Sequence, residues 1–398
     1  MTQVVRIDPS RTTVTPQDPA DAPPLRDRAL VHVVRQYKPS VGGLEDFVAS
    51  LAAQQRGRFK RIRVVTCDRV FRGDGAKLPK REIIDGIEVV RLPYVGSPRY
   101  PVTPGVLSAI RDADLVHVHA VDFFFDALAA TRWLHRKPLI ATTHGGFFHS
   151  PAYRRIKQTW FATLTRASAA GYRALACCSR SDFERFRTIA PTRARLIENG
   201  VDIGKLADAG AKDPVKGLVT VGRLAQNKRV DRLLDALAVL VRNDPAWHLD
   251  IIGTPFDWSA EDVAAMIAER GLTTHARLHV GPSDAEMREI VGRASLFVSA
   301  SVYEGFGIAL IEAMSAGLAP VVEGNAAFRA FADAHDGIAI TDFAQAETAA
   351  RAISETFARL SHGDVARLRA EAMAVAEGYS WPATAARYEA LYREALGV

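Results

Sequence analysis

The sequence is poor in cysteine and contains no long hydrophobic run. Its 398 residues include three cysteines, two of which, Cys177 and Cys178, are adjacent. This number and spacing provide neither a disulfide framework nor a set of metal ligands, and they favour a reducing cytosol. No apolar stretch reaches the length needed to span a bilayer. We therefore expect a cytoplasmic protein that is neither disulfide-stapled nor embedded in a membrane.

Residues 1–28 lack an apolar core. They contain five prolines and many Asp and Thr residues, so they resemble neither a signal peptide nor a strand. We expect this segment to be a mobile tail. The rest of the chain, with 48% apolar and 24% charged residues overall, has ordinary globular composition and enough length for two domains.

The net charge of +6 conceals an asymmetry. Residues 1–200 contain 32 Lys and Arg against 18 Asp and Glu, a balance of +14, whereas residues 201–398 contain 19 against 27, a balance of −8. Such a split indicates two domains with different partners. A basic half can face nucleic acid or an anionic membrane surface. The chain has no recognisable nucleic-acid motif, so we favour the membrane and expect no nucleic-acid partner.

Short apolar runs alternate with helical patterns in both halves, which predicts an α/β fold with two doubly wound, Rossmann-like parallel sheets facing a common cleft. Residues 207–216 are mostly small and polar, as in an interdomain linker. The domains are expected at residues 29–205 and 206–378. The expected strands are residues 29–34, 63–66, 87–91, 115–119, 139–143, 175–178, 195–202 with a terminal Asn-Gly turn, 217–223, 248–253, the strand before Gly281, and residues 294–299 and 318–322.

Residues 303–314 form the most informative stretch, because glycines separate an apolar run from a helical pattern that begins at residue 308. Gly305, Phe306 and Gly307 let the backbone approach an anion, and the free N–H groups of the following helix point at it. Glu304 and Glu312 stand on either side, where they can accept hydrogen bonds from hydroxyl groups. A ligand whose phosphate binds the amides and whose hydroxyls bind the carboxylates would be a nucleotide sugar. An ordinary turn with two solvated glutamates would show the same pattern.

Other candidates follow expected strands, where ligands of open α/β sheets bind. Gly42 and Gly43 lie in a loop after the first strand, although a plain turn would look the same. His144 ends a strand, where a histidine is also a common structural hydrogen-bonding group. Arg223 and Lys228 lie between a strand and a helix and can bind a diphosphate, or they can be solvated surface charges.

Residues 150–170 alternate basic and apolar side chains, as in a helix that lies on a membrane surface. The same pattern fits a core-facing helix with a solvated basic face. The residues concerned are Arg154, Arg155, Lys157 and Arg166 with Tyr153, Ile156, Trp160, Phe161 and Leu164.

From residue 29 onward, the order and spacing of these motifs resemble the retaining glycosyltransferases of family 4, which have the GT-B fold. The specific part is the pair Glu304 and Glu312 around Gly-Phe-Gly. The other contributing residues are Gly42, Gly43, His144, residues 199–202, Gly222, Arg223 and Lys228. By this resemblance, residues 379–398 form a helix that crosses back and packs on the first domain.

Four stretches of the first domain look closer to one group of that family, the α-mannosyltransferases of xanthan- and acetan-type exopolysaccharide assembly. They are residues 32–37, 97–101, 121–126 and 143–149. The resemblance implies transfer of mannose from GDP-mannose to a cellobiosyl-diphosphopolyprenol, with retention and an α-1,3 bond. It also implies a peripheral position on the inner face of the cell membrane.

The family's donor-binding roles map onto matching positions of this chain. Arg223 and Lys228 would hold the diphosphate and offset charge on the leaving group, so no metal or other cofactor would be required. Glu312 would bind the ribose hydroxyls. Glu304 and the amides of Phe306 and Gly307 would bind the sugar.

The remaining roles belong to the first domain. His144 would contact a sugar hydroxyl near the reacting carbon, and Gly42 and Gly43 would leave room for phosphate and sugar. Arg99, Tyr100 and Asp122 are further candidates for binding the acceptor. Many relatives have glycine immediately after the lysine, where this chain has Arg229, so the local loop differs from the family pattern.

Two rival interpretations remain open at this stage. The donor could be UDP-glucose or UDP-N-acetylglucosamine on another lipid-linked glycan, since no residue distinguishes guanine from uracil. The chain could also be a non-catalytic protein that binds a sugar nucleotide, although it keeps Arg223, Lys228, Glu304 and Glu312 together.

Overall fold

The computed structural model describes residues 25–71, 75–145 and 158–398. The chain forms two compact units, the first made of residues up to Gly200 together with Trp381–Val398 and the second of Val201–Ser380. The sequence analysis places the corresponding boundaries at residues 205/206 and 378/379.

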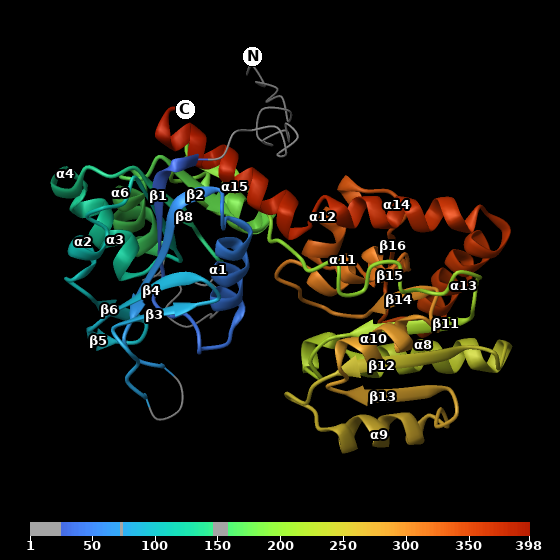
Figure 1. The fold of residues 1–398 in the computed structure, drawn as a ribbon. Helices are drawn as coiled ribbons and strands as arrows, with labels where there is room; N and C mark the ends of the chain where they lie inside the picture. The colour runs from blue at the N-terminus through green and yellow to red at the C-terminus, as the bar shows by residue number, and fades with distance from the viewer. Residues whose placement is uncertain (1–24, 72–74, 146–157) are drawn as a thin grey trace, which may run out of the picture. The chain divides into compact units, whose positions relative to one another are not determined.

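The first unit is built on an eight-stranded sheet in the order β10-β9-β8-β7-β1-β2-β4-β3 (Figure 1). Its neighbouring strands are parallel except for β3 and β4. The central strands are buried on both faces, which explains why they read as continuous apolar runs. The strands are β1 (Leu25–Val33), β2 (Phe59–Cys67), β3 (Arg81–Ile84), β4 (Ile87–Leu92), β7 (Leu115–His119), β8 (Leu139–Thr142), β9 (Ala174–Cys177) and β10 (Ala194–Leu196).

Strand β1 corrects the expected end of the N-terminal tail. It begins at Leu25, which pairs with Phe59, so residues 25–28 belong to the sheet rather than to a tail. The register shifts between Leu25 and Ala29, and the intervening side chains are largely exposed. Because they are polar and exposed, they hide the strand from an apolar pattern. Residues 1–24 lie outside the described residues.

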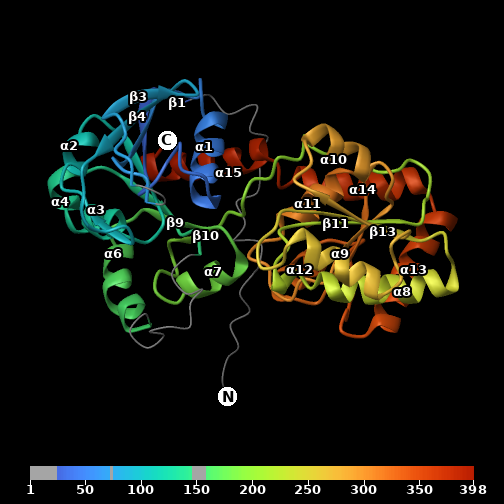
Figure 2. The same cartoon turned by 90° about the horizontal axis from the view of Figure 1, so that it is seen from below.

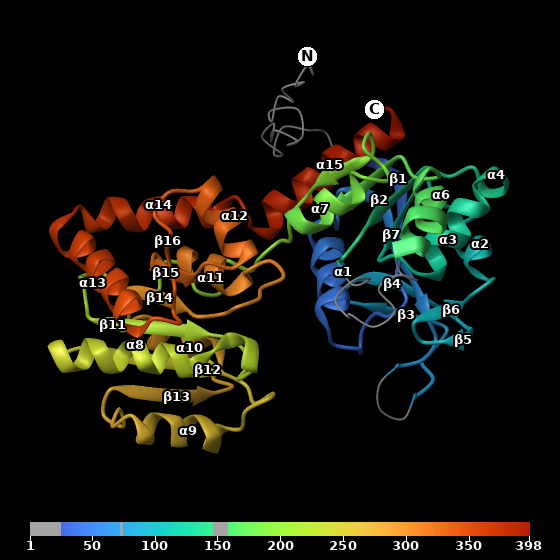
Figure 3. The same ribbon diagram turned by 180° about the vertical axis from the view of Figure 1, so that it is seen from behind.

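Helices cover both faces of this sheet, as Figures 2 and 3 show from below and from behind. Buried side chains of α1 and α15 pack on one face, and those of α2, α3, α6 and α7 pack on the other. The C-terminal helix therefore belongs to the first unit. The helices are α1 (Gly43–Gln54), α2 (Val106–Ala109), α3 (Phe123–Ala130), α4 (Arg132–His135), the π-helix η2 (Phe161–Thr165), α6 (Arg166–Ala169), α7 (Arg180–Phe186) and α15 (Trp381–Leu396); a short hairpin joins β5 (Val95–Ser97) to β6 (Tyr100–Val102).

The second unit has a six-stranded parallel sheet in the order β13-β12-β11-β14-β15-β16. This is the order of a doubly wound nucleotide-binding sheet, in which the chain returns to the middle after its third strand. The strands are β11 (Gly217–Val221), β12 (His248–Gly253), β13 (Ala276–Val280), β14 (Leu296–Ser299), β15 (Ala319–Glu323) and β16 (Ala339–Thr341).

Two apolar clusters fill the second unit, one on each face of the sheet. Helices α8, α9 and α13 contribute to one cluster, and α10, α11, α12 and α14 contribute to the other. The bounds are η3 (Gln226–Lys228), α8 (Val230–Asn243), α9 (Ala260–Glu269), α10 (Asp284–Val291), α11 (Ile308–Ser315), α12 (Ala326–Ala334), α13 (Ala346–His362) and α14 (Val365–Glu377).

Candidate active site

The strand order of the second unit brings the predicted donor-binding motifs together. Strands β11 and β14 are neighbours, and Leu218 pairs with Leu296. Their carboxyl ends therefore lie side by side at the switch point of the sheet, where such folds bind ligands. Gly222 and Arg223 follow β11, and residues 300–307 follow β14.

Lys228 and Glu304 form an ion pair at this switch point. The Lys228 Nζ donates a hydrogen bond to Glu304 Oε1 at 2.6 Å, and the two side chains are 22% and 15% exposed. Lys228 ends the short helix η3, whose backbone also meets the loop after β14, because the Val302 N–H donates to the Asn227 carbonyl at 2.9 Å. The two residues that the sequence assigns separately to diphosphate and sugar are thus direct neighbours.

Gly222 and Arg223 border the same ion pair. A methyl group on Gly222 would lie 3.2 Å from Lys228 Cε, so the glycine allows the lysine stem to pass closely over the end of β11. The guanidinium of Arg223 lies 4.3 Å from the centre of the Phe256 ring, a cation–π contact. This contact orients a planar, permanently charged group that can bind two phosphate oxygens at once.

The loop after β14 is held by backbone and side-chain hydrogen bonds. Asn227 Nδ2 donates to the Tyr303 carbonyl at 3.0 Å, and Asn325 Nδ2 donates to the Ser301 carbonyl at 2.8 Å. Gly307 has a φ of 101° and precedes α11, so the left-handed turn favours glycine. The Phe306 ring is buried against Phe331 and Tyr379, so only the backbone of Phe306 is available to a ligand.

Glu312 lies in α11, beyond this loop. Burial raises the pKa of its carboxyl group, and Asp202 and Asp284 act in the same direction. Lys205 opposes this shift in the pKa of Glu312, but its ammonium group is already paired with Asp284 at 2.9 Å. A partly buried carboxylate in this setting gains from hydroxyl donors, because they satisfy its oxygens without adding charge.

The first unit has a similar switch point between β1 and β7, which pair over Leu30–Val33 and Leu115–Val118. Gly42 and Gly43 follow β1 and begin α1. A methyl group on Gly42 would lie 2.6 Å from Glu45 Oε2, whereas one on Gly43 would meet no atom within 4 Å. Gly43 therefore faces open space, and the acidic side chains Glu45 and Asp46 occupy the first helical turn.

His144 follows β8 in a left-handed backbone conformation with a φ of 50°. Its Nε2 lies 3.2 Å from His119 Nδ1, and its ring makes an edge contact with Phe47 at 4.7 Å. Burial lowers the pKa of His144 to about 3, with Arg35 adding to the effect. His144 is therefore neutral at physiological pH and can exchange hydrogen bonds with a hydroxyl group.

Asp182 holds the backbone on both sides of His144. Its Oδ2 accepts from the Gly145 N–H at 2.8 Å and from the Thr143 hydroxyl at 2.5 Å. Asp182 is not among the site residues expected from the sequence. Its N–H donates to the hydroxyl oxygen of Ser179, which caps α7.

The three acceptor candidates differ in their surroundings. Asp122 caps α3 by accepting from the Phe124 N–H at 3.0 Å, and its Oδ2 has no hydrogen-bond partner among the described residues. The Tyr100 hydroxyl donates to Asp126 Oδ2 at 3.0 Å, so it is committed to α3. Arg99 is exposed in the turn between β5 and β6.

Part of the predicted basic amphipathic segment lies outside the described residues, including Arg154, Arg155 and Lys157. Within the described remainder, Phe161 is buried in the core of the first unit. Trp160 and Leu164 are 41% and 37% exposed.

Comparison with known families identifies two matching models. The model of glycosyl transferases group 1 matches residues 206–361, and that of Glycosyltransferase Family 4 matches residues 41–205. Together these matches cover most of both units.

Two named relatives resemble the chain over nearly its full length. The GDP-mannose:cellobiosyl-diphosphopolyprenol alpha-mannosyltransferase of Komagataeibacter xylinus is 42% identical over 376 residues, covering 92% of this chain and 93% of the relative. The enzyme of the same name from Xanthomonas campestris is 40% identical over 370 residues, covering 92% and 97%.

Solved structures confirm the GT-B fold. The structure of Anabaena HepE in complex with UDP aligns over 92% of this chain and 99% of its own chain, with a TM-score of 0.67 and 17% sequence identity. A glycosyltransferase from Rickettsia africae covers 93% and 98%, also with a TM-score of 0.67, at 16% identity. The two family matches, the close relatives and the fold agree, and the chain therefore belongs to family 4 of the glycosyltransferases.

Proposed function

We propose that the protein transfers mannose from GDP-mannose to a cellobiosyl-diphosphopolyprenol, with retention and an α-1,3 bond, during assembly of an exopolysaccharide repeat unit. The observation that carries this proposal is the identity of 40–42% with two alpha-mannosyltransferases named for this donor and acceptor, over 92% of the chain. Three residues that the family resemblance assigns to the donor, Arg223, Lys228 and Glu304, lie near the switch point of the second sheet, and this supports the proposal.

The charges at this switch point suit a nucleoside diphosphate. Arg223 and Lys228 supply two positive charges, and Glu304 offsets one of them through its 2.6 Å ion pair. A diphosphate bound beside Lys228 would gain a charge-assisted hydrogen bond and the nearby amides at the start of α11. Glu312 would accept hydrogen bonds from the ribose hydroxyls, and Glu304 from the sugar.

The reaction can then follow a front-face substitution. The bond between the mannose C1 and the diphosphate oxygen breaks, and its electron pair stays on the departing GDP. The acceptor hydroxyl attacks from the same face and passes its proton to the departing phosphate. Arg223 and Lys228 stabilise the charge that develops on this leaving group. We expect full activity after exhaustive chelation of divalent metals, and loss of activity on chelation would refute this metal-independent mechanism.

We also propose that the protein acts at the inner face of the cell membrane, where its lipid-linked acceptor would be found. None of the helices in the described part of the chain is both long and apolar enough to cross a membrane. Helix α4 exposes Trp133 and Leu134, which are 76% and 57% accessible. Arg132, Arg136 and Lys137 flank them, and this combination of an amphipathic aromatic, an apolar side chain and basic groups suits an anionic lipid surface.

Sedimentation with vesicles of phosphatidylglycerol and phosphatidylcholine tests this contact. The double variant Trp133→Ala with Leu134→Ala should bind at least fivefold more weakly, because two exposed apolar side chains no longer enter the interface. Ile83→Ala is the matched control, since Ile83 is also exposed, at 69%, but lies on β3. Equal binding by the double variant and the wild type would refute the role of α4.

Transfer of labelled sugar to a synthetic cellobiosyl-diphospholipid tests the function itself. GDP-mannose, UDP-glucose and UDP-N-acetylglucosamine are offered in parallel, with Lys228→Ala as the control. We expect transfer from GDP-mannose alone and its loss in the variant. Transfer from a UDP-sugar instead would overturn the mannosyltransferase assignment, and no transfer from any donor would favour another acceptor or a non-catalytic protein.

A further inference from the structure

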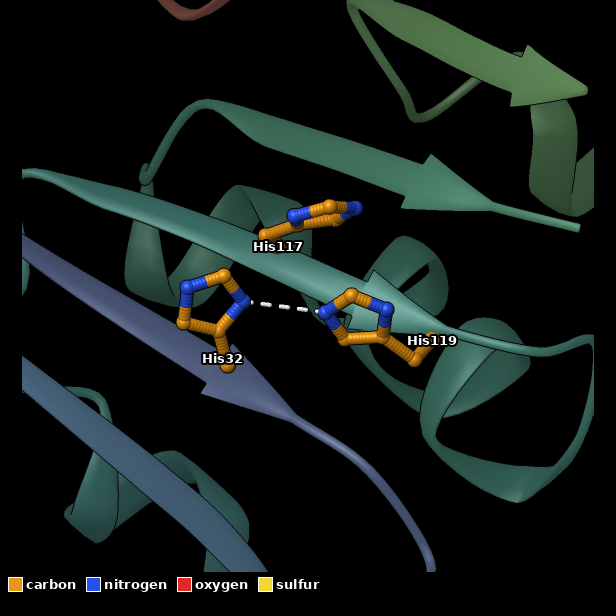
Figure 4. A group of neighbouring side chains, drawn as sticks. All are labelled: His32, His117 and His119. Atoms are coloured by element: carbon orange, nitrogen blue, oxygen red, sulfur yellow. Dashed lines mark hydrogen bonds between the residues drawn. The ribbon is translucent and has the colours of Figure 1, made fainter. Parts of the chain in front are cut away.

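Three buried histidines lie together on the face of the first sheet that α1 and α15 cover. His32 on β1 is directly opposite His117 on β7, and His119 follows on the same side of β7 (Figure 4). All three are 0% exposed. Burial lowers the pKa of His32 to about 4 and the pKa values of His117 and His119 well below their usual range. Each ring is therefore neutral, with one nitrogen that donates and one that accepts.

Two of these rings connect α1 to His144. The Gln55 Oε1 lies 2.9 Å from His32 Nε2, the His32 Nδ1 lies 2.9 Å from His119 Nε2, and the His119 Nδ1 lies 3.2 Å from His144 Nε2. Because a neutral imidazole cannot donate from both nitrogens, one fixed end determines the direction of every bond in this row.

Gln55 fixes that end. Its Nε2 donates to the Tyr392 hydroxyl at 3.1 Å, which leaves its carbonyl oxygen facing His32. A carbonyl only accepts, so His32 carries its proton on Nε2 and accepts at Nδ1. His119 must then donate from Nε2 and accept at Nδ1. His144 in turn must donate from Nε2, and its Nδ1 keeps the lone pair.

The same orientation satisfies His117. The Tyr392 hydroxyl, which accepts from Gln55, donates its proton to His117 Nδ1 at 2.8 Å. The His117 Nε2 then donates to the Thr142 hydroxyl oxygen at 2.7 Å. Both nitrogens of each of the three rings have protein partners, so none is left unsatisfied in the core.

A metal ion is the competing explanation for three clustered histidines. A tetrahedral zinc site with Zn–N bonds of about 2.0–2.1 Å would hold its nitrogens about 3.3 Å apart. The nitrogens of His32 and His119 that face each other are 2.9 Å apart, which is a hydrogen-bond distance. The partners of the other ring nitrogens are a glutamine, a tyrosine, a threonine and another histidine, as expected of a hydrogen-bonded core.

We propose that Gln55, His32 and His119 are positioning residues that hold His144 in the tautomer protonated at Nε2. The Nδ1 of His144 then acts as a hydrogen-bond acceptor for a hydroxyl group of the sugar. The role of the sugar rests on the proposed function, whereas the tautomer does not. If the amide of Gln55 were reversed, every bond in the row would reverse and His144 would carry its proton on Nδ1.

Nuclear magnetic resonance of the full chain with ¹⁵N-labelled histidine rings tests the tautomer without any substrate. Two-bond ¹⁵N–¹H correlations distinguish the two tautomers, and the His144 signal is identified by its loss in His144→Asn. We expect His32, His119 and His144 all to carry the proton on Nε2. A proton on Nδ1 of His144, an equal mixture, or a stoichiometric bound metal in the purified protein would overturn the proposal.

Two matched variants test the consequence for His144. His119→Phe interrupts the row, so the His144 signals should move toward a mixture of tautomers. The value of kcat/KM should fall about five- to tenfold, as expected when one aligned hydrogen bond is lost. Leu115→Ala removes buried volume from the same apolar cluster without changing a hydrogen bond of the network, and it should leave the His144 tautomer unchanged. A similar shift of the His144 signals in both variants would indicate a general packing effect and refute the positioning role. Absence of transfer by the wild type would instead count against the proposed function.

Discussion

Replacing Lys228 by alanine tests the central electrostatic element of the donor site. Its ammonium group is 2.6 Å from Glu304 and its side chain is 22% exposed, so water screens the charge only in part. Two unit charges about 3 Å apart interact with about 5 kcal/mol at an effective dielectric constant of 20, which sets an upper bound. Screening and the competing carboxylate reduce this value, and removal of one preorganised charge contact from a developing anion costs about 3–4 kcal/mol. We therefore expect kcat/KM for mannose transfer to fall by about 10²–10³-fold.

The assay follows labelled mannose into the lipid-linked acceptor, and circular dichroism confirms that the variant is folded. Lys212→Ala is a suitable control, because Lys212 forms a salt bridge in the same unit with Asp208 but is 61% exposed. Its activity should stay within twofold of wild type. The double variant Lys228→Ala with Glu304→Gln separates the loss of the cation from the carboxylate left without its partner. Near-normal turnover of Lys228→Ala in folded protein would refute the role of Lys228.

Three further predictions concern other residues. In Glu312→Gln, the affinity for GDP measured by calorimetry should fall about tenfold, because the lost interaction involves ribose hydroxyls. The affinity for the 2′,3′-dideoxy analogue of GDP should stay close to that of the wild type. An equal loss of affinity for both ligands would contradict this role of Glu312. Burial raises the pKa of Asp122 to about 7, so the folded state retains a proton that the unfolded state has lost, and this group contributes a loss of stability as pH rises from about 4 to about 7. The buried histidines contribute in the opposite direction in both proteins, so the measurement is the difference in thermal melting between Asp122→Asn and the wild type. Asp122→Asn keeps the hydrogen bond from Phe124 and should gain stability relative to the wild type over this pH range; parallel melting curves would count against the shift. Arg229 has a φ of 51° and pairs with Asp231. Once that pair is lost in both variants, Arg229→Gly should be about 1 kcal/mol more stable than Arg229→Ala in urea, and equal stability would show that the left-handed turn has no cost.

The sequence was sufficient for the elements with strong local signals. The helix expected from residue 308 is α11. The short strands β3, β5 and β6 were not recognised, because each has three or four residues and Pro101 is the only buried residue among them. The start of β1 was missed because Arg26 and Asp27, near its beginning, are polar and exposed, so they do not belong to an apolar run.

In the candidate site, too, the sequence predicted single residues but not the contacts between distant parts of the chain. Residue types and spacing predicted Lys228 and Glu304 individually, but not their ion pair, because contact between residues 76 positions apart depends on the adjacency of β11 and β14. For Phe306 the sequence predicted a ligand contact through the backbone amide and did not predict the position of the ring. The ring is buried against Phe331, so the backbone is the part of Phe306 that remains available to a ligand.

The histidine row shows what strand register adds to a sequence pattern. His117 and His119 are two residues apart, so a strand places them on the same face, and this signal was available from the sequence. Their relation to His32 was not, because it requires β1 and β7 to pair with His32 opposite His117. Gln55, which directly follows α1, bonds to His32, and Tyr392 of α15 bonds to Gln55. These two helices come from opposite ends of the chain. A one-residue slip of β7 would turn both of its histidines toward α3, which would leave the Nδ1 of His32 and the Tyr392 hydroxyl without their ring partners. The buried polar bonds therefore select a single register, and the same bonds fix the proton on His144.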